Sequence, residues 1–312
     1  MRLVEEHSRI LPSFGFTSAH HNLYRLLLRV IPVMAFFCVN AAFAFHSHGA
    51  TPAGQREENP ADLVREVMHA EIDSQLHDDS LWCFRESRED DGNTLKTLEV
   101  CQTNAGDIER LVLRNGQEIS TSEKEAEERR IEKLIDHPEQ LRAKQKKQHE
   151  DQEQFRNLMT VFPDAFRFRY DGAEGDLIKL NFRPNPAFRP STRMALVFHH
   201  MEGKLVVDSK QKRVVEINGR LTSPVKFAGG FLGHLDEGGT FLVKEQEVAP
   251  NHWDVTILNI NINGKALFFK TIAIQQKEIY SDYTRVPAGI TLQQTAELLK
   301  RKCTGVNTAS SK

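Results

Sequence analysis

Residues 227–239, FAGGFLGHLDEGG, contain five glycines, a pattern that cradles phosphate in many nucleotide-binding proteins. A phosphate loop needs a strand before the glycines and a helix after them, whose first amides bind the anion. Here the following residues, TFLVKEQEV, predict a strand, and Gly230, Gly233 and Gly238 do not fit the G-x-G-x-x-G spacing. The glycines instead favour bends and a bulge at the rim of a sheet. Phe231 and Leu232 then either fold over the open end of that sheet or fill its core.

Histidines and carboxylates offer the other candidate chemistry. His199 and His200 are neighbours, so on a strand they point to opposite faces and do not bind one metal together. No spacing predicts a partner for His199 such as Glu202 or His234, and neither G-x-S-x-G nor H-E-x-x-H occurs. The acidic residues 89–91 predict a solvated hairpin tip. We therefore expect no enzyme, no metal and no cofactor; a hydrolase that uses His199 or His234 is the remote alternative.

Cys83 and Cys101 each lie nine positions from Gly92, which sits in the turn sequence REDDGN. A hairpin that turns there places the two cysteines opposite each other. We expect a cross-strand disulfide, worth about 3 kcal/mol for a loop of this size. The alternative is a pair of free buried thiols. Cys303, near the C-terminus, predicts a free thiol.

Residues 1–44 have the three parts of a secretory signal. Arg25 and Arg29 form a positive flank, an apolar run follows, and cleavage is predicted between Ala44 and Phe45. The predicted compartment is the periplasm, with an uncleaved N-terminal anchor as the alternative. Residues 45–59 predict a disordered linker and 303–312 a disordered tail.

The composition is that of an ordinary folded protein, with 39% hydrophobic and 27% charged residues. The formal net charge of −2 argues against nucleic-acid binding, which needs a clear basic excess. The 312 residues, less the N-terminal segments, predict one domain over residues 60–302.

Periodicity predicts an α+β fold with an antiparallel sheet. A helix capped by Asn59 and opened by Pro60 precedes three short strands. Residues 120–162 predict a charged helical insertion with a capping box at Ser120 and Glu123, whose middle is solvated. From residue 166 apolar side chains alternate with polar ones, as in strands, and a helix after Thr291 ends the domain.

The last strands carry apolar residues on both faces. We expect strands at 253–262 and 265–274, joined by a hairpin turn at Asn263-Gly264. Such strands leave apolar surface in water unless both faces are covered. The pattern therefore predicts a curved sheet with helices on one side and further cover, or a ligand, on the other.

The stretches FRPNPAFRP and GGFLGHL are the most specific signals in the chain. Over roughly residues 60–300 the chain resembles a family of exported bacterial proteins of unknown function. More distantly it resembles the periplasmic carriers of outer-membrane lipoproteins, the LolA/LolB/RseB-like superfamily. That resemblance implies an open half-barrel, a LolA-like fold, whose helices cover its concave side around an apolar cavity.

The function expected from these features is non-enzymatic. We expect a periplasmic protein that binds a lipid or a lipidated protein in an apolar groove, as in lipoprotein sorting, with transient contact to a membrane surface. The alternative is an envelope sensory or scaffold module that binds a protein partner through the helices of residues 120–160. The residues expected to line the groove are Phe227, Phe231, Leu232, Trp253, Phe268 and Ile272.

Overall fold

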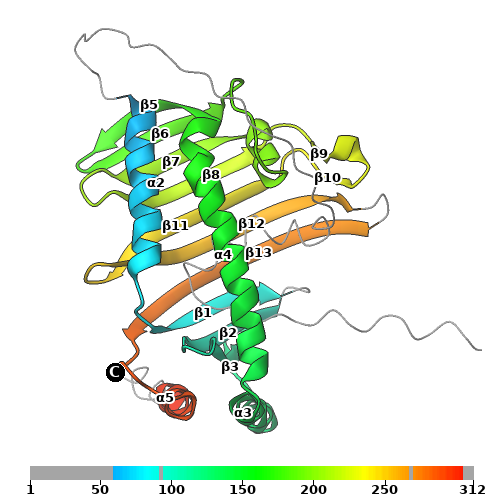
Figure 1. The fold of residues 1–312 in the computed structure, drawn as a ribbon. Helices are drawn as coiled ribbons and strands as arrows, with labels where there is room; N and C mark the ends of the chain where they lie inside the picture. The colour runs from blue at the N-terminus through cyan, green and yellow to red at the C-terminus, as the bar shows by residue number, and fades with distance from the viewer. Residues whose placement is uncertain (1–58, 91–93, 267–269, 305–312) are drawn as a thin grey trace, which may run out of the picture.

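The computed structural model describes residues 59–90, 94–266 and 270–304, and these form an α+β fold. Its dominant feature is one large antiparallel sheet, which is curved and not closed (Figure 1). The strand order is β4-β3-β2-β1-β13-β12-β11-β8-β7-β6-β5, so the first strand of the chain pairs with the last one. The predicted class and the curved antiparallel sheet are confirmed.

A long helical excursion, α3 and α4, separates the first four strands of the chain from the later ones. The elements before and within that excursion are α2 (Pro60–His77), β1 (Trp82–Asp90), β2 (Thr94–Cys101), β3 (Ile108–Arg114), β4 (Gln117–Glu118), α3 (Thr121–Asp136) and α4 (Glu139–Ala165). Those after it are β5 (Phe166–Glu174), β6 (Leu177–Pro184), η1 (Met194–His200), β7 (Met201–Asp208), β8 (Arg213–Leu221), β9 (Val225–Phe227), η2 (Ala228–Gly230), β10 (Gly233–Leu235), β11 (Thr240–Ala249), β12 (His252–Ala266), β13 (Lys270–Arg285) and α5 (Leu292–Thr304).

Helices α2 and α4 cross one face of the sheet, here called the covered face (Figure 1). The apolar stripe of α2, with Val64 and Val67 fully buried, packs there, as the periodicity predicts. The C-terminal half of α4 adds Phe155 and Phe162, and Phe162 contacts the rings of Phe166, Phe182 and Phe198. The main core therefore fills the covered face over β5 to β12 with the chain's own side chains, and it extends to residues of β13, β1 and β2.

A second, smaller core lies at the other end of the sheet. It contains the disulfide between Cys83 and Cys101, together with Ile131 of α3, Leu141 of α4 and Leu299 of α5. Figure 1 shows α3 and α5 beside β1 to β3, away from α2. The two cysteines are directly paired in the β1–β2 register, so the predicted hairpin and its disulfide are both confirmed.

The helical insertion is two helices and not one solvated rod. Ser120 and Glu123 form the predicted capping box of α3, and α4 begins after Pro138. Most side chains in the middle of α4 are exposed or half-buried, but Gln148 is only 5% exposed. The expectation of a solvated middle was therefore wrong at this position, where α4 contacts the body.

The predicted turn at Asn263-Gly264 was also wrong. Strand β12 continues through both residues to Ala266, and β13 begins at Lys270, so the segment 265–274 belongs to two strands. Gly264 is needed for a different reason: a Cβ there would lie 2.2 Å from the carbonyl oxygen of His234 in β10. The glycine thus permits the short strand β10 to approach β12 closely.

The second face of the sheet, here called the open face, is largely polar over these strands. From Leu258 to Ala266, buried residues alternate with exposed ones, and the exposed set is Asn259, Asn261, Asn263 and Lys265. The expectation that both faces need cover was therefore wrong for β12 after Leu258 and for β13. At the start of β12 both faces are covered, since Trp253, Asp254 and Val255 are all buried. Leu267 and Phe269, which the pattern also places on the second face, lie outside the described residues.

The glycine-rich stretch forms a small hairpin of β9 and β10 at the rim of the sheet. No helix follows it, since the next regular element is strand β11, in agreement with the predicted bends. Helix α5 extends to Thr304, two residues into the predicted tail. The signal segment, the cleavage site at Ala44 and Phe45, and most of the linker lie outside the described residues. Within the described part, no helix is long and apolar enough to span a membrane.

Candidate functional site

A groove of about 720 Å³ runs between the small end of the sheet and the helices α3 and α4; it is here called the helix groove. Leu98 of β2 and Leu111 of β3 contribute from the sheet. Leu134 of α3 and Leu141 of α4 contribute from the helices. The volume falls in the range of sites that bind small molecules.

Charged side chains surround this apolar part of the groove. Six basic and four acidic residues line it, so the lining carries a net charge of +2. The basic residues are Arg88, Lys96, Arg114, Arg130, Lys144 and Lys147, and the acidic ones are Asp107, Glu109, Glu127 and Asp151. The lining is therefore amphipathic, with more basic than acidic residues around leucine side chains, and two of the basic ones, Arg88 and Arg114, pair with Glu86 and Glu123 outside the lining.

Glu109 links the sheet to α4 at the centre of the groove. Its carboxylate accepts a hydrogen bond from Lys144 at 2.5 Å and lies 3.9 Å from Arg88. Arg88 also pairs with the fully buried Glu86 at 3.0 Å. Burial alone would lower the pKa of Arg88, but the charges of Glu86, Glu109 and Glu278 outweigh it and raise that pKa. Arg88 is thus a permanent buried cation beneath the groove.

The covered face changes character between β12 and β13. On β12, the side chains that face the helices are apolar. At the same level on the next two strands the buried side chains are polar: Gln276 and Glu278 of β13 and Glu86 of β1 are nearly or fully buried. Both Gln276 and the hydroxyl of Tyr280 donate to Glu278. This buried polar strip interrupts the apolar packing of the covered face, which continues beyond it at Phe84, Leu98 and Val100.

A second, smaller cavity of about 190 Å³ lies where the end of α2 and the middle of α4 meet the starts of β1 and β12. Its lining is rich in side-chain amides, and it is here called the glutamine pocket. The five glutamines that line it are Gln75, Gln102, Gln145, Gln148 and Gln152. The pocket shares Asp107 and Gln148 with the helix groove.

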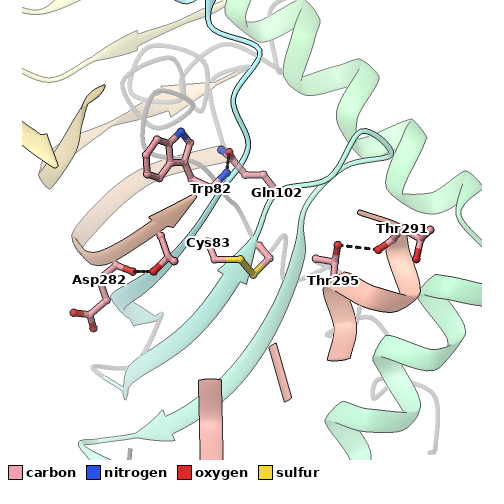
Figure 2. The surroundings of a disulfide bond; sticks show 8 residues. Trp82, Cys83, Gln102, Asp282, Thr291 and Thr295 are labelled. Atoms are coloured by element: carbon pink, nitrogen blue, oxygen red, sulfur yellow. Dashed lines mark hydrogen bonds between the residues drawn. A yellow bond between two sulfur atoms is a disulfide. The ribbon is translucent and has the colours of Figure 1, made fainter. Parts of the chain in front are cut away.

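Trp82 forms one wall of the glutamine pocket and directly precedes the disulfide (Figure 2). Its backbone amide donates to the side-chain oxygen of Gln102 at 2.7 Å, and its indole N–H donates to Ser80 at 2.7 Å. The indole stacks on His252, with ring centroids 4.1 Å apart. The disulfide therefore fixes the strand that positions this wall.

Acidic side chains complete the pocket. The His252 ring is 3.1 Å from Asp78 and 3.6 Å from the buried Asp254. Burial raises the pKa of Asp78, but hydrogen bonds from Ser80 and the nearby His252 outweigh it, so the pKa lies below its ordinary value. Asp78 is thus an acceptor of hydrogen bonds in the pocket near neutral pH.

Next to the pocket, three carboxylates lie in the interior around one arginine. Arg213 pairs with Glu71 of α2 at 2.9 Å, and Glu245 of β11 is fully enclosed nearby. Burial, together with the charges of Glu71 and Asp254, raises the pKa of Glu245 well above its ordinary value in spite of Arg213. Glu245 consequently holds a proton in the folded protein at pH values where a free carboxyl group has lost it.

A third cavity, of about 850 Å³, is a hollow on the open face over β5 to β8. Its basic residues alternate along the strands with buried ones such as Phe182 and Leu221, so they point away from the helices. One acidic residue, Glu202, joins five exposed basic ones: Arg167, Arg169, Arg183, Lys204 and Arg220. This basic hollow is a surface feature separate from the helix groove.

The structure brings only some of the residues predicted to line an apolar groove together, and it places these in a core. Phe227 is buried in the main core, and Leu232 and Ile272 pack against that core. Phe231 is 67% exposed, and Phe268 lies outside the described residues. Trp253 lies at the opposite end of β12 from the position that pairs with Ile272, about 36 Å away at ~3.3 Å per residue. None of the five that the structure describes lines the three cavities described above.

The histidines considered for hydrolysis are also apart. His199 packs against the ring of Phe188, whereas His234 is 3.2 Å from Asp236 in the β10 region. His200 contacts the hydroxyl of Ser223 at 2.7 Å, and burial, with the charge of His199, lowers its pKa. Among the described residues, no group of three or more histidine, cysteine, aspartate or glutamate side chains has the arrangement of a metal site.

The amphipathic groove and the glutamine pocket were not found from the sequence. Their residues are charged or amide side chains in a stretch that has the composition of a solvated helix. A signal does exist in hindsight: Leu134, Leu141 and Gln148 recur at seven-residue spacing across the α3–α4 junction. That spacing continues past Pro138, which the pattern alone treats as a break. No family model, curated protein or solved structure matches the chain.

Proposed function

We propose that this protein is a non-enzymatic binding protein that holds an amphipathic lipid in the helix groove. The acyl chain lies against Leu98, Leu111, Leu134 and Leu141, and its anionic end is held by the basic residues around them. The observation that carries the proposal is the combination of a ligand-sized groove, apolar side chains from four elements and an excess of positive charge. Burial of each methylene there contributes about 0.8 kcal/mol.

The fold supports this proposal in general terms. A curved open sheet with helices across one face is the arrangement implied by the resemblance to LolA-like carriers of lipoproteins. Fold likeness alone is weak support for an activity, so the proposal depends on the groove. Because the main core fills the covered face over β5 to β12, the ligand is proposed at the small end of the sheet, not near Phe227 or Ile272.

The compartment is part of the proposal. The signal pattern of residues 1–44 predicts export, and a buried disulfide between Cys83 and Cys101 is typical of proteins in oxidising compartments such as the periplasm. The basic hollow on the open face offers a contact with the anionic surface of a membrane, from which a lipid carrier takes its ligand.

Binding of fatty acids of increasing chain length to the purified protein tests the proposal. Affinity should rise about fourfold with each methylene until the groove is full. Leu134→Glu places a charge in the groove and should weaken palmitate binding at least tenfold. The matched control is Leu76→Glu, on the exposed side of α2, where the side chain is 57% exposed.

Circular dichroism of both variants separates loss of binding from loss of folding, and Leu111→Glu provides a second probe of the groove from the sheet side. If the folded wild-type protein binds neither palmitate nor phosphatidylglycerol, by titration and by native mass spectrometry, the proposal is wrong. Equal palmitate affinity in Leu134→Glu, Leu111→Glu and Leu76→Glu would place the lipid elsewhere.

A further inference from the structure

We propose that the glutamine pocket is a second binding site, for a small neutral ligand rich in hydroxyl groups, such as a single sugar ring or a cyclic polyol. The site goes beyond the lipid proposed for the helix groove, and Gln75 belongs to the pocket but not to the groove. The inference depends on unsatisfied polar atoms, on volume and on charge.

Two of the side-chain amides that line the pocket, one from α2 and one from α4, have an unsatisfied atom. Among the described residues, the Gln75 Oε1 atom and the Gln148 Nε2 atom are buried and have no hydrogen-bond partner. Gln148 is 5% exposed and lines the pocket from the middle of α4. A buried polar group without a partner destabilises the folded protein, so a ligand that satisfies both groups removes this cost on binding.

The chemistry of these two atoms selects the ligand class. The oxygen of Gln75 requires a donor, and the amide nitrogen of Gln148 requires an acceptor. An ammonium group offers only donors and a carboxylate only acceptors, whereas each hydroxyl group offers both. A ligand with several hydroxyls therefore satisfies both amides and can also donate to Asp78 and Asp254.

The charge of the pocket excludes anions. Asp78, Asp107 and Asp254 line it against a single arginine, Arg156. An anionic ligand would lie close to these carboxylates in a partly dehydrated site, which is unfavourable. The same amphipathic lipid that fits the helix groove is thus unsuited to the glutamine pocket.

The size of the pocket limits the ligand to one ring. A volume of about 190 Å³ equals the space of about six water molecules at roughly 30 Å³ each. Trp82 supplies an apolar wall next to the amides; because one face of its indole is stacked on His252, the rest of this buried ring is what a ligand can contact.

Trp82 also makes the site measurable. The chain has two tryptophans, Trp82 and Trp253, and only Trp82 lines the pocket. In a Trp253→Phe background, titration with D-glucose, D-galactose, D-ribose and myo-inositol at micromolar to millimolar concentrations should give saturable fluorescence changes for at least one of these probes. Isothermal titration calorimetry on the wild-type protein provides an independent measurement.

Two variants and one control give the decisive comparison. Gln75→Leu and Gln148→Leu should each weaken binding of the responding probe at least tenfold. Replacing a buried amide without a partner by an apolar group is expected to preserve or raise stability, so these variants should fold. The control is Gln154→Leu, on the exposed side of α4, the helix that carries Gln148; this variant should bind the probe like the wild type.

The outcomes separate this site from the lipid groove. Loss of sugar binding in Gln75→Leu with unchanged palmitate binding supports a distinct pocket. If no probe binds the folded wild-type protein, or if a high-resolution structure grown with the probes shows ordered water only in the pocket, the inference is wrong. Equal affinity for the probe in Gln75→Leu, Gln148→Leu and Gln154→Leu would overturn it as well.

Discussion

Replacement of Glu245 by glutamine should change how the stability of this protein depends on pH. Glu245 is 4% exposed, and its pKa is raised well above the ordinary value of 4.5 by burial first and then by Glu71 and Asp254. Above about pH 4.5 the unfolded chain loses this proton while the folded protein keeps it. The free energy of unfolding therefore falls as pH rises, up to the pH at which folded Glu245 also ionises.

The magnitude follows from a single proton. Over that window the wild-type stability should fall by at most about 1.4 kcal/mol per pH unit because of Glu245. Glutamine has nearly the same shape and does not titrate, so Glu245→Gln removes this contribution. The variant and the wild type should have similar stability near pH 4, and the variant should be increasingly the more stable of the two toward pH 8.

Urea unfolding followed by tryptophan fluorescence at a series of pH values measures the difference. Glu247→Gln is the matched control, because Glu247 lies on the same strand and is exposed. The difference between Glu247→Gln and the wild type should not change with pH over the same range. Parallel stability curves for Glu245→Gln and the wild type would refute the reasoning, since they would show that Glu245 titrates alike in both states.

Three further perturbations test other parts of the structure. Replacing Cys83 and Cys101 by serine should lower the free energy of unfolding by about 3 kcal/mol in urea, for a separation of 18 residues; a change near zero would contradict a constraining disulfide. Gly203→Ala should cost about 1–3 kcal/mol and lower Tm, because its Cβ would lie 1.9 Å from a backbone oxygen; an unchanged Tm would contradict this close approach. Arg167→Glu combined with Arg169→Glu should weaken sedimentation with phosphatidylglycerol vesicles in a salt-sensitive way; salt-independent binding would exclude the basic hollow.

Much of the fold could be predicted from local patterns. The cap at Asn59, the capping box at Ser120 and the position of Gly92 between two cysteines each depend on residues within a few positions of one another. Local hydrogen bonds and turns obey such short-range rules, so these elements were found correctly.

The errors come from interactions between distant segments. Asn263-Gly264 has the sequence of a tight turn, but Gly264 accommodates the backbone of β10, which no nearby residue reveals. Gln148 lies in a segment whose composition is that of a solvated helix, yet its side chain is buried because α4 crosses the sheet at that point. The candidate site could not be predicted for the same reason: polar residues line it, and their burial depends on tertiary packing that periodicity does not encode.

Helix α4 joins the two cores of the molecule, and this has a consequence for motion. Its C-terminal half is anchored by Phe155 and Phe162 in the large core, whereas its N-terminal half is anchored in the small one by Leu141. Hydrogen exchange along this one helix should therefore be graded, with slow amides after Phe155 and faster ones near Leu141. Such a gradient would mean that the first turns of α4 open locally while its C-terminal half stays packed in the large core.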